Sequence, residues 1–180
     1  MIPESKSPFW ARRERKRSIS NLAMEASTAV SDLADPAKAS RAYTTKQMGD
    51  ACEMLVAAEL TLAGIPALKV PDNWPHYDVI AQPFDGEPKL ISVKARTYKA
   101  GSNFVNFWHD SSFDWLAAVI LKGRGEREIY LIPRAVFEAR ATKAGPEAKR
   151  PEWYCRIDQM RKTFPEYLNN FRLLPDGAPV

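Results

Sequence analysis

The sequence predicts an α/β fold in which a central mixed β-sheet is flanked by helices. Three observations support this fold class. A strong amphipathic helix pattern, KQMGDACEMLVAAELTLAG, comes first; short strand-like segments separated by turn residues follow it; and helical patterns return near the C-terminus. One helix, then several strands, then helices is the order typical of a layered α/β domain. A length of 180 residues with 45% hydrophobic residues suits one such domain with an extension.

The long helix begins at Thr44 or Thr45, because either hydroxyl can act as an N-cap for the first turn. It ends at Gly64, a residue type that favours the C-terminal end of a helix. A second helix is predicted over residues 18–34, where Asp35-Pro36 ends it because the residue before proline disfavours the helical conformation.

Runs of apolar and β-branched residues bounded by turn signals predict the strands. They cover residues 67–70, 77–82, 89–96, 104–108, 115–121 and 128–132. The segments 77–82 and 89–96 are joined by FDGEP, which favours a hairpin. Pro133 opens a short helix over residues 134–141, KAGPEAKRP forms a loop, and a last helical stretch lies within residues 158–170.

The net charge of +4 comes entirely from residues 1–46, which predicts two parts: a basic N-terminal arm and helix over residues 1–43, and a neutral domain over residues 44–180. The run RRERKR is either a phosphate-binding arm or a solvated tail. Its basic residues are Arg12, Arg13, Arg15, Lys16 and Arg17.

Several function classes are disfavoured. The sequence has no run of about 18 apolar residues and no apolar centre of a signal peptide near its beginning, so we expect a cytoplasmic protein with no membrane partner. Cys52 and Cys155 are far apart and are expected to be free thiols. No phosphate-binding loop of the GxxxxGK[ST] type is present.

The strand LISVKAR raises the question of chemistry, because Ser92, Lys94 and Arg96 share its polar face. Asp78 lies in the apolar segment YDVIAQ, where a carboxylate needs a cation, a metal ion or N–H donors nearby. The hairpin would bring Asp78 close to Lys94, either as a plain salt bridge or as half of a metal site. Glu53 lies at the edge of the apolar stripe of the long helix, where it reaches into solvent or into a site.

The segment FVNFWHDSSFDW gathers five aromatic residues, which either form core beneath an edge strand or stack on unpaired bases beside a basic groove. They are Phe104, Phe107, Trp108, Phe113 and Trp115.

A helix start of the form G-x-x-x-E, an Asp on a strand and a strand ending V-K-x-R, in this order, resemble the PD-(D/E)xK nuclease superfamily, in its branch similar to Holliday junction resolvases and restriction endonucleases. The matching residues span about 46–97: Gly49, Glu53, Leu60, Gly64, Asp78, Val93, Lys94 and Arg96. The resemblance implies a restriction-endonuclease-like three-layer fold. It also implies a metal-dependent DNA endonuclease that uses one or two Mg²⁺ or Mn²⁺ ions.

The resemblance also assigns roles to individual residues. Asp78 would be the main metal ligand, the backbone carbonyl of Val93 a second one, and Glu53 would act from the helix directly or through water. Lys94 would position or activate the attacking water and stabilise developing charge. Arg96 would hold a neighbouring phosphate.

Ser92 departs from the family pattern, which has Glu or Asp two residues before the lysine. Serine is a weak, neutral ligand for Mg²⁺, so the ion is expected to be held weakly. The alternative is a catalytically weak or inactive nuclease-fold module that binds DNA through RRERKR and Arg96. DNA is the expected partner in both cases, and a homodimer is compatible with either.

Overall fold

The computed structural model describes residues 43–99, 101, 103–145, 147–149 and 151–177. The predicted helix over residues 18–34 and the basic run RRERKR lie outside these described residues. Within the described part of the chain, no helix is both long enough and apolar enough to cross a membrane.

Helix α2 (Thr45–Leu62) confirms the long helix predicted from the sequence. Thr44 is its N-cap: the threonine hydroxyl accepts from the Gln47 N–H at 3.2 Å, and the Gln47 side chain accepts from the Thr44 N–H at 2.8 Å. This reciprocal pair satisfies two N–H groups that the first turn leaves unpaired. Gly64 follows the helix with a φ of 91°, a conformation that glycine adopts without steric cost.

The main sheet has five strands in the order β1-β2-β3-β5-β6. Only the β3 to β5 pairing is parallel, so the sheet is mixed, as predicted. The predicted hairpin between the second and third strands is confirmed, with Val79 opposite Ile91. The strand bounds are β1 (Ala67–Lys69), β2 (Val79–Ala81), β3 (Lys89–Thr97), β5 (Trp115–Leu121) and β6 (Arg127–Pro133).

A second sheet of three strands has the order β4-β8-β7. Its strands are β4 (Phe104–Trp108), β8 (Glu152–Arg156) and β7 (Thr142–Lys143). The sequence did not predict β7 or β8. The short helical elements are η1 (Gly123–Gly125), α3 (Arg134–Arg140), α4 (Met160–Thr163) and η2 (Pro165–Tyr167). The predicted helix within residues 158–170 therefore exists as two short pieces, the second of which begins at Pro165.

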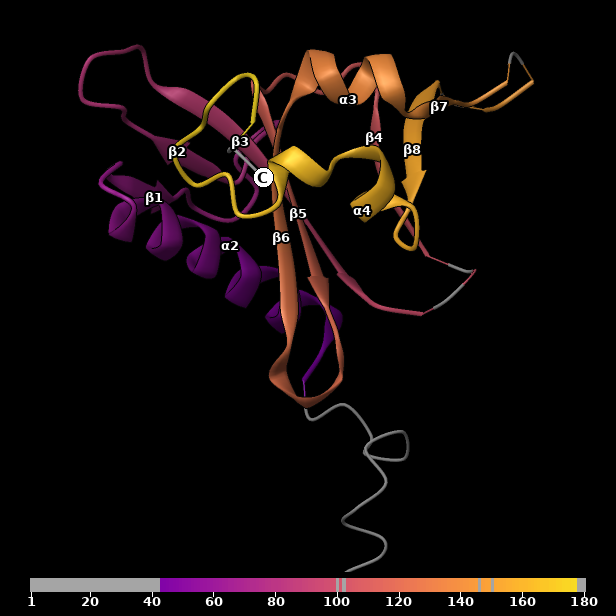
Figure 1. Cartoon of the computed structure of the whole chain (residues 1–180), viewed down its shortest axis with the longest axis horizontal. Coiled ribbons are helices and arrows are strands. Elements are labelled where there is room, and N and C mark those ends of the chain that lie inside the picture. The colour runs from indigo at the N-terminus through magenta and orange to yellow at the C-terminus, as the bar shows by residue number, and fades with distance from the viewer. Residues whose placement is uncertain (1–42, 100, 102, 146, 150, 178–180) are drawn as a thin grey trace, which may run out of the picture. The chain divides into compact units, whose positions relative to one another are not determined.

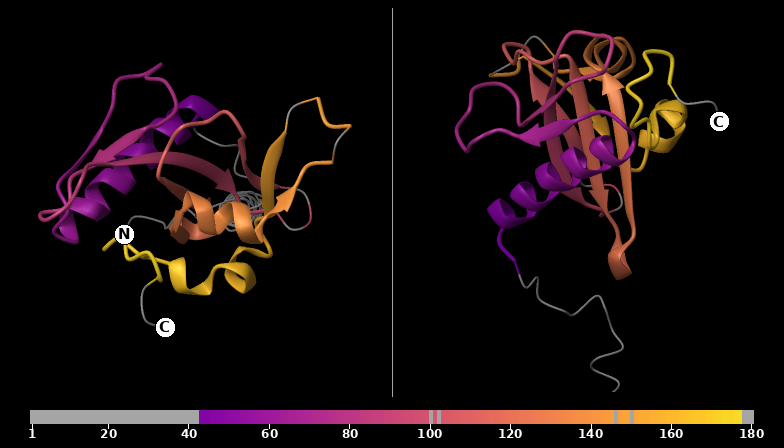
Figure 2. Two further views of the ribbon diagram at one scale, coloured as in Figure 1. Left: turned by 90° about the horizontal axis from the view of Figure 1, so that it is seen from above. Right: turned by 90° about the vertical axis from the view of Figure 1, so that its left-hand side faces the viewer.

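The main sheet separates two hydrophobic cores. On one face, α2 packs against alternate β3 residues, namely Ile91, Val93 and Ala95. The second core lies on the other face and includes residues of the small sheet together with Phe137 of α3 and Met160 of α4. Figures 1 and 2 show α2 crossing one side of the sheet, with α3, α4 and β8 on the other. The main sheet is therefore the central layer of three. Helix α2 forms one outer layer, and the small sheet with α3 and α4 forms the other.

Candidate active site

The candidate site lies where the short strand β2 begins beside the longer strand β3. Because β2 begins at Val79, the ladder between the two strands has no β2 residue opposite Val93. The Asp78 side chain takes that place: its Oδ2 accepts from the Val93 N–H at 2.6 Å. A carboxylate so held has an N–H donor, which explains how the apolar segment accommodates an acid.

Ser92 joins Asp78 to Lys94. The Ser92 hydroxyl donates to Asp78 Oδ2 at 3.3 Å and accepts from Lys94 Nζ at 2.9 Å. The serine is only 2% exposed, so both bonds lie away from bulk water. Asp78 and Lys94 therefore meet through a hydroxyl and not as a direct salt bridge.

Lys94 is a cation held in a desolvated position. Burial lowers its pKa below 10.5, and the neighbouring Arg96 guanidinium lowers it further, while Asp78 and Glu53 oppose part of the shift. Within the part of the chain that the structure describes, no carboxylate lies within ion-pair distance of the Lys94 ammonium. An amine of this kind releases a proton more readily than an exposed lysine, and while charged it attracts an anion.

Glu53 projects from α2 into a cleft of about 280 Å³ that Asp78 also lines. Its side chain is 19% exposed, and its Oε2 lies 3.1 Å from Lys69 Nζ. Glu53 is therefore mostly shielded from solvent, and its direct charged partner is Lys69. Glu53 lies on α2 and Asp78 directly before β2, 25 positions apart in the sequence, and both line one cleft.

Sequence reasoning missed Lys69, which organises the acidic side of this cleft. Its ammonium pairs with Glu53, with Asp72 at 2.7 Å and with Asp50 at 3.8 Å. Hydrogen bonds to Asp72 and Glu53 raise the pKa of Lys69, and those from Lys46 and Lys69 lower the pKa of Asp72 to about 2. The spacing of Lys46, Asp50 and Glu53 places these three charged side chains on one helix face, which was a signal in the sequence for a charged cluster. That signal does not include Lys69 itself.

The carboxylates that line this cleft are the groups that could hold a divalent ion. Among the described residues, no group of three or more His, Cys, Asp or Glu side chains is arranged to hold a metal. Mg²⁺, however, is commonly bound by one or two carboxylates, several waters and the phosphates of the substrate. Asp78 and Glu53 supply two carboxylates at one cleft, so these residues fit a divalent ion that is held weakly.

Arg96 lies two residues beyond Lys94 on the same face of β3. Its guanidinium donates to the carbonyl oxygens of Phe104 at 2.8 Å and Ala95 at 2.9 Å and to the Asn106 side chain at 2.9 Å. Burial lowers its pKa from 12.5. Two cations that lack a carboxylate partner within the described chain thus follow one another along the strand.

Comparisons with known proteins find structural similarity only. No protein-family model matches the chain, and a comparison with curated proteins finds no match. The bacterial homing endonuclease I-Ssp6803I shares 17% sequence identity, over 72% of this chain and 90% of that one, with a TM-score of 0.50. The Holliday junction resolvase Hjc of Archaeoglobus fulgidus shares 14% identity, over 62% and 90%, with a TM-score of 0.38. The likeness to the first structure supports the restriction-endonuclease-like fold predicted from the sequence.

Proposed function

We propose that this chain is a metal-dependent DNA endonuclease of the PD-(D/E)xK type, in which Ser92 replaces the second acid of the motif. The observation that carries the proposal is the hydrogen-bonded series from Asp78 through Ser92 to Lys94, beside a cleft that Glu53 also lines. A salt bridge that served only stability would join the two charged groups directly. Here the lysine is instead desolvated and left without a carboxylate partner in the described chain.

Asp78 and Glu53 would hold one Mg²⁺ or Mn²⁺ ion, or two, with the Val93 carbonyl as a further oxygen ligand. In an extended strand the N–H and C=O of one residue point to the same side, and the Val93 N–H points to Asp78. When bound, the ion would lower the pKa of a water molecule and neutralise phosphate charge. Ser92 contributes no charge to this set, which makes the ion weakly held.

Lys94 would act on the attacking water and on the phosphate. Its lowered pKa means that a larger fraction of the side chain is the neutral amine than in an ordinary lysine, and the neutral amine is the form that can accept a proton from water. In its charged form the ammonium donates to a phosphate oxygen on which negative charge develops. Arg96, one step along the strand face, would hold the adjacent phosphate. Outside the described residues, Arg12, Arg13, Arg15, Lys16 and Arg17 would add contacts to the DNA backbone that carry no sequence information.

The proposal is tested by incubating the full chain with plasmid, junction and flapped DNA in the presence of Mg²⁺ or Mn²⁺. Asp78→Asn and Lys94→Met are each expected to lower the cleavage rate by about 100-fold, the usual loss when one charge-stabilising group is removed. Asp85→Asn and Lys99→Met change exposed residues of the same types and serve as matched controls. Absence of cleavage by the wild type, or cleavage that survives both site substitutions, contradicts the proposal.

A second candidate function is a nuclease-fold module that binds DNA without cutting it. It is favoured by the Ser92 hydroxyl, which occupies the place of a carboxylate, and by the Lys69 ammonium, which already pairs with Glu53. This function predicts DNA binding that weakens steeply with salt and is unchanged by a chelator. Binding combined with metal-dependent cleavage would exclude it.

A further inference from the structure

The small sheet carries a second surface that the proposed cleavage chemistry does not use. Residues alternate along β4 and β8: Val105, Phe107, Trp153 and Cys155 are buried in the core beneath. The opposite face of these two strands presents Phe104, Asn106, Trp108, Glu152, Tyr154 and Arg156. We name this set the outer face of the small sheet.

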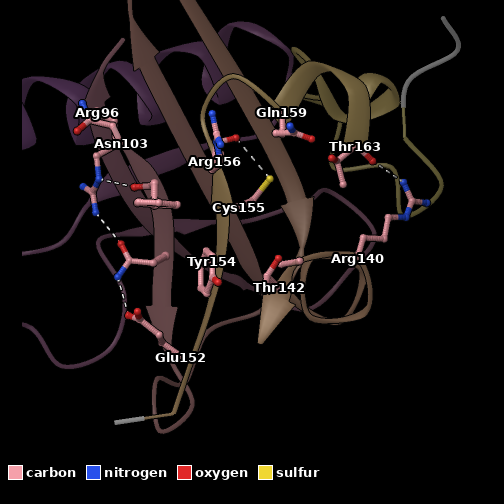
Figure 3. Close-up of a pocket in the computed structure, with 13 residues that line it drawn as sticks. Arg96, Asn103, Arg140, Thr142, Glu152, Tyr154, Cys155, Arg156, Gln159 and Thr163 are labelled. Atoms are coloured by element: carbon pink, nitrogen blue, oxygen red, sulfur yellow. Dashed lines mark hydrogen bonds between the residues drawn. The ribbon is translucent and has the colours of Figure 1, made fainter. Parts of the chain in front are cut away.

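The outer face borders a cleft of about 840 Å³, larger than the one beside Glu53. Phe104 is 40% exposed, and its ring meets the Tyr154 ring edge to face with centroids 5.4 Å apart. Around the two rings, Asn103, Asn106 and Gln159 also line the cleft. Figure 3 shows Tyr154 in the middle of this cleft. On one side of it, hydrogen bonds run from Arg96 through Asn106 to Glu152, and on the other lies the side chain of Arg140.

Charge on this surface is unevenly compensated. Arg140 pairs with Glu166 at 2.5 Å and Arg156 with Asp158 at 2.6 Å, so both cations have acidic partners. Arg96 bonds only to neutral oxygens among the described residues. Three of its five N–H groups make these bonds, and the guanidinium keeps donors for a phosphate. The cation of this cleft that suits an anionic ligand is therefore Arg96.

Arg96 also connects the outer face to the candidate active site. It follows Lys94 on one face of β3, about 6.6 Å further along the strand, and its bonds to Phe104 and Asn106 reach the small sheet. This separation suits successive phosphates of one extended DNA strand. A strand whose phosphate lies at Lys94 can thus place its next phosphate at Arg96 and the attached base against Phe104 and Tyr154.

We infer that the outer face of the small sheet binds an unpaired segment of DNA, so that the substrate of the proposed endonuclease has single-stranded nucleotides beside the scissile phosphate. Aromatic rings combined with a cation that tracks the backbone are the elements by which proteins hold single strands. Asn106 donates to Glu152 at 2.9 Å, and the second oxygen of Glu152 can accept from the amino group of a base. The inference rests on the proposed function for the position of the cut but not for the binding itself.

The test measures binding of the full chain to a fluorescent single strand of about 12 nucleotides, and to the duplex of the same sequence, in the presence of a chelator. Tyr154→Leu removes the ring and is expected to weaken single-strand binding about tenfold, with little effect on the duplex. Tyr154→Phe keeps the ring and is the matched control, expected to bind as the wild type does. Equal affinity of Tyr154→Leu and wild type for the single strand overturns the inference.

A second measurement needs no substitution, so it holds even where Tyr154→Leu fails to fold. A single strand containing 5-iododeoxyuridine is photocrosslinked to the wild-type chain, and the modified peptides are identified by mass spectrometry. Adducts on Phe104, Trp108 or Tyr154 support the inference, and adducts exclusively elsewhere overturn it. Both measurements omit metal, so absence of cleavage in the nuclease assay leaves their outcome unaffected, and the two proposals fail separately.

Discussion

The ammonium of Lys69 lies 3.1 Å from the carboxylate of Glu53, the residue that the proposed function assigns to a metal ion. The two groups come from β1 and α2 and meet in the cleft that Asp78 also lines. A built-in cation therefore occupies the neighbourhood of a proposed ligand. An incoming divalent ion has to compete with it for the Glu53 oxygens.

Removing the Lys69 charge is expected to strengthen metal binding. Lys69→Met leaves Glu53 without its cation, so the carboxylate is free to hold a divalent ion more tightly, and the affinity for Mn²⁺ is expected to rise severalfold. Titration calorimetry with Mn²⁺ measures the change. Lys46→Met is the matched control, because Lys46 pairs with Asp50 and Asp72 and not with Glu53. Unchanged Mn²⁺ affinity in Lys69→Met would remove Glu53 from the ligand set.

Restoring an acid at position 92 is expected to make stability depend on metal. Ser92→Asp places a second carboxylate beside Asp78 in a site where the serine is 2% exposed, so the protein without metal loses about 1–3 kcal/mol of stability. Millimolar Mn²⁺ should then raise the melting temperature more than it does for the wild type, because an ion that binds only the folded state stabilises it. Ser92→Asn has a similar size without charge and should show no such gain. If Mn²⁺ does not change the melting temperature of Ser92→Asp, that result would argue against an ion at Asp78.

The lowered pKa of Lys94 predicts a stability that rises with pH. Between the folded pKa and 10.5 the unfolded chain binds the lysine proton more tightly than the folded chain does, so the free energy of unfolding increases with pH across that window. Compared with Lys94→Met, the wild type should gain about 1.4 kcal/mol for each tenfold weakening of proton binding in the folded state. Urea denaturation at several pH values up to 10.5 measures the difference. Lys99→Met, at an exposed position, should show no such trend. A difference between wild type and Lys94→Met that does not change with pH would mean that Lys94 is solvated.

The N-cap of α2 is expected to contribute about 1 kcal/mol to stability. Thr44→Ala removes the hydroxyl that accepts from the Gln47 N–H and should lower the free energy of unfolding by that amount. Thr45→Ala changes the next residue, which is exposed and lies inside the helix, and should have a much smaller effect. Thermal unfolding of both variants is the measurement. Equal losses in the two variants would show that the cap does not stabilise the helix.

Elements whose signals are local were predictable from the sequence. The ends of α2 follow from Thr44 and Gly64. Strand β3 follows from the alternation of Ile91, Val93 and Ala95 with Ser92, Lys94 and Arg96. Strand β8 was missed because its five residues follow a loop, and their partner strand β4 lies more than forty positions earlier. Strand β8 is stabilised by pairing with β4 and by packing beside Val105 and Phe107, and interactions between segments so far apart in the sequence leave no local pattern.

The sequence indicated Glu53, Asp78 and Lys94 as candidates for one site, but it indicated neither Lys69 nor the contacts that join these residues. The hairpin placed Asp78 near Lys94, as expected, yet the contact runs through Ser92, a residue whose type suggested only a missing ligand. The aromatic segment divides: along β4, strand alternation buries Phe107 and leaves Phe104 and Trp108 on the outer face, while Phe113 and Trp115, beyond that strand, are buried. Whether such residues form core or surface depends on what covers each face of the strand, which is a property of the tertiary fold.

The hydrogen bond from the Val93 N–H gives the Asp78 carboxylate a structural role in addition to its proposed chemical role. The side chain continues the β2 to β3 ladder by one step, so its removal would leave the Val93 N–H of the central strand β3 unpaired beyond the end of β2. A chain that had lost all catalysis would still benefit from an acid at this position. Lys94 has no comparable structural role. Its partial burial costs stability, and in the described chain it has no carboxylate partner. The presence of Lys94 is therefore a better indicator of the proposed cleavage chemistry than the presence of Asp78 is.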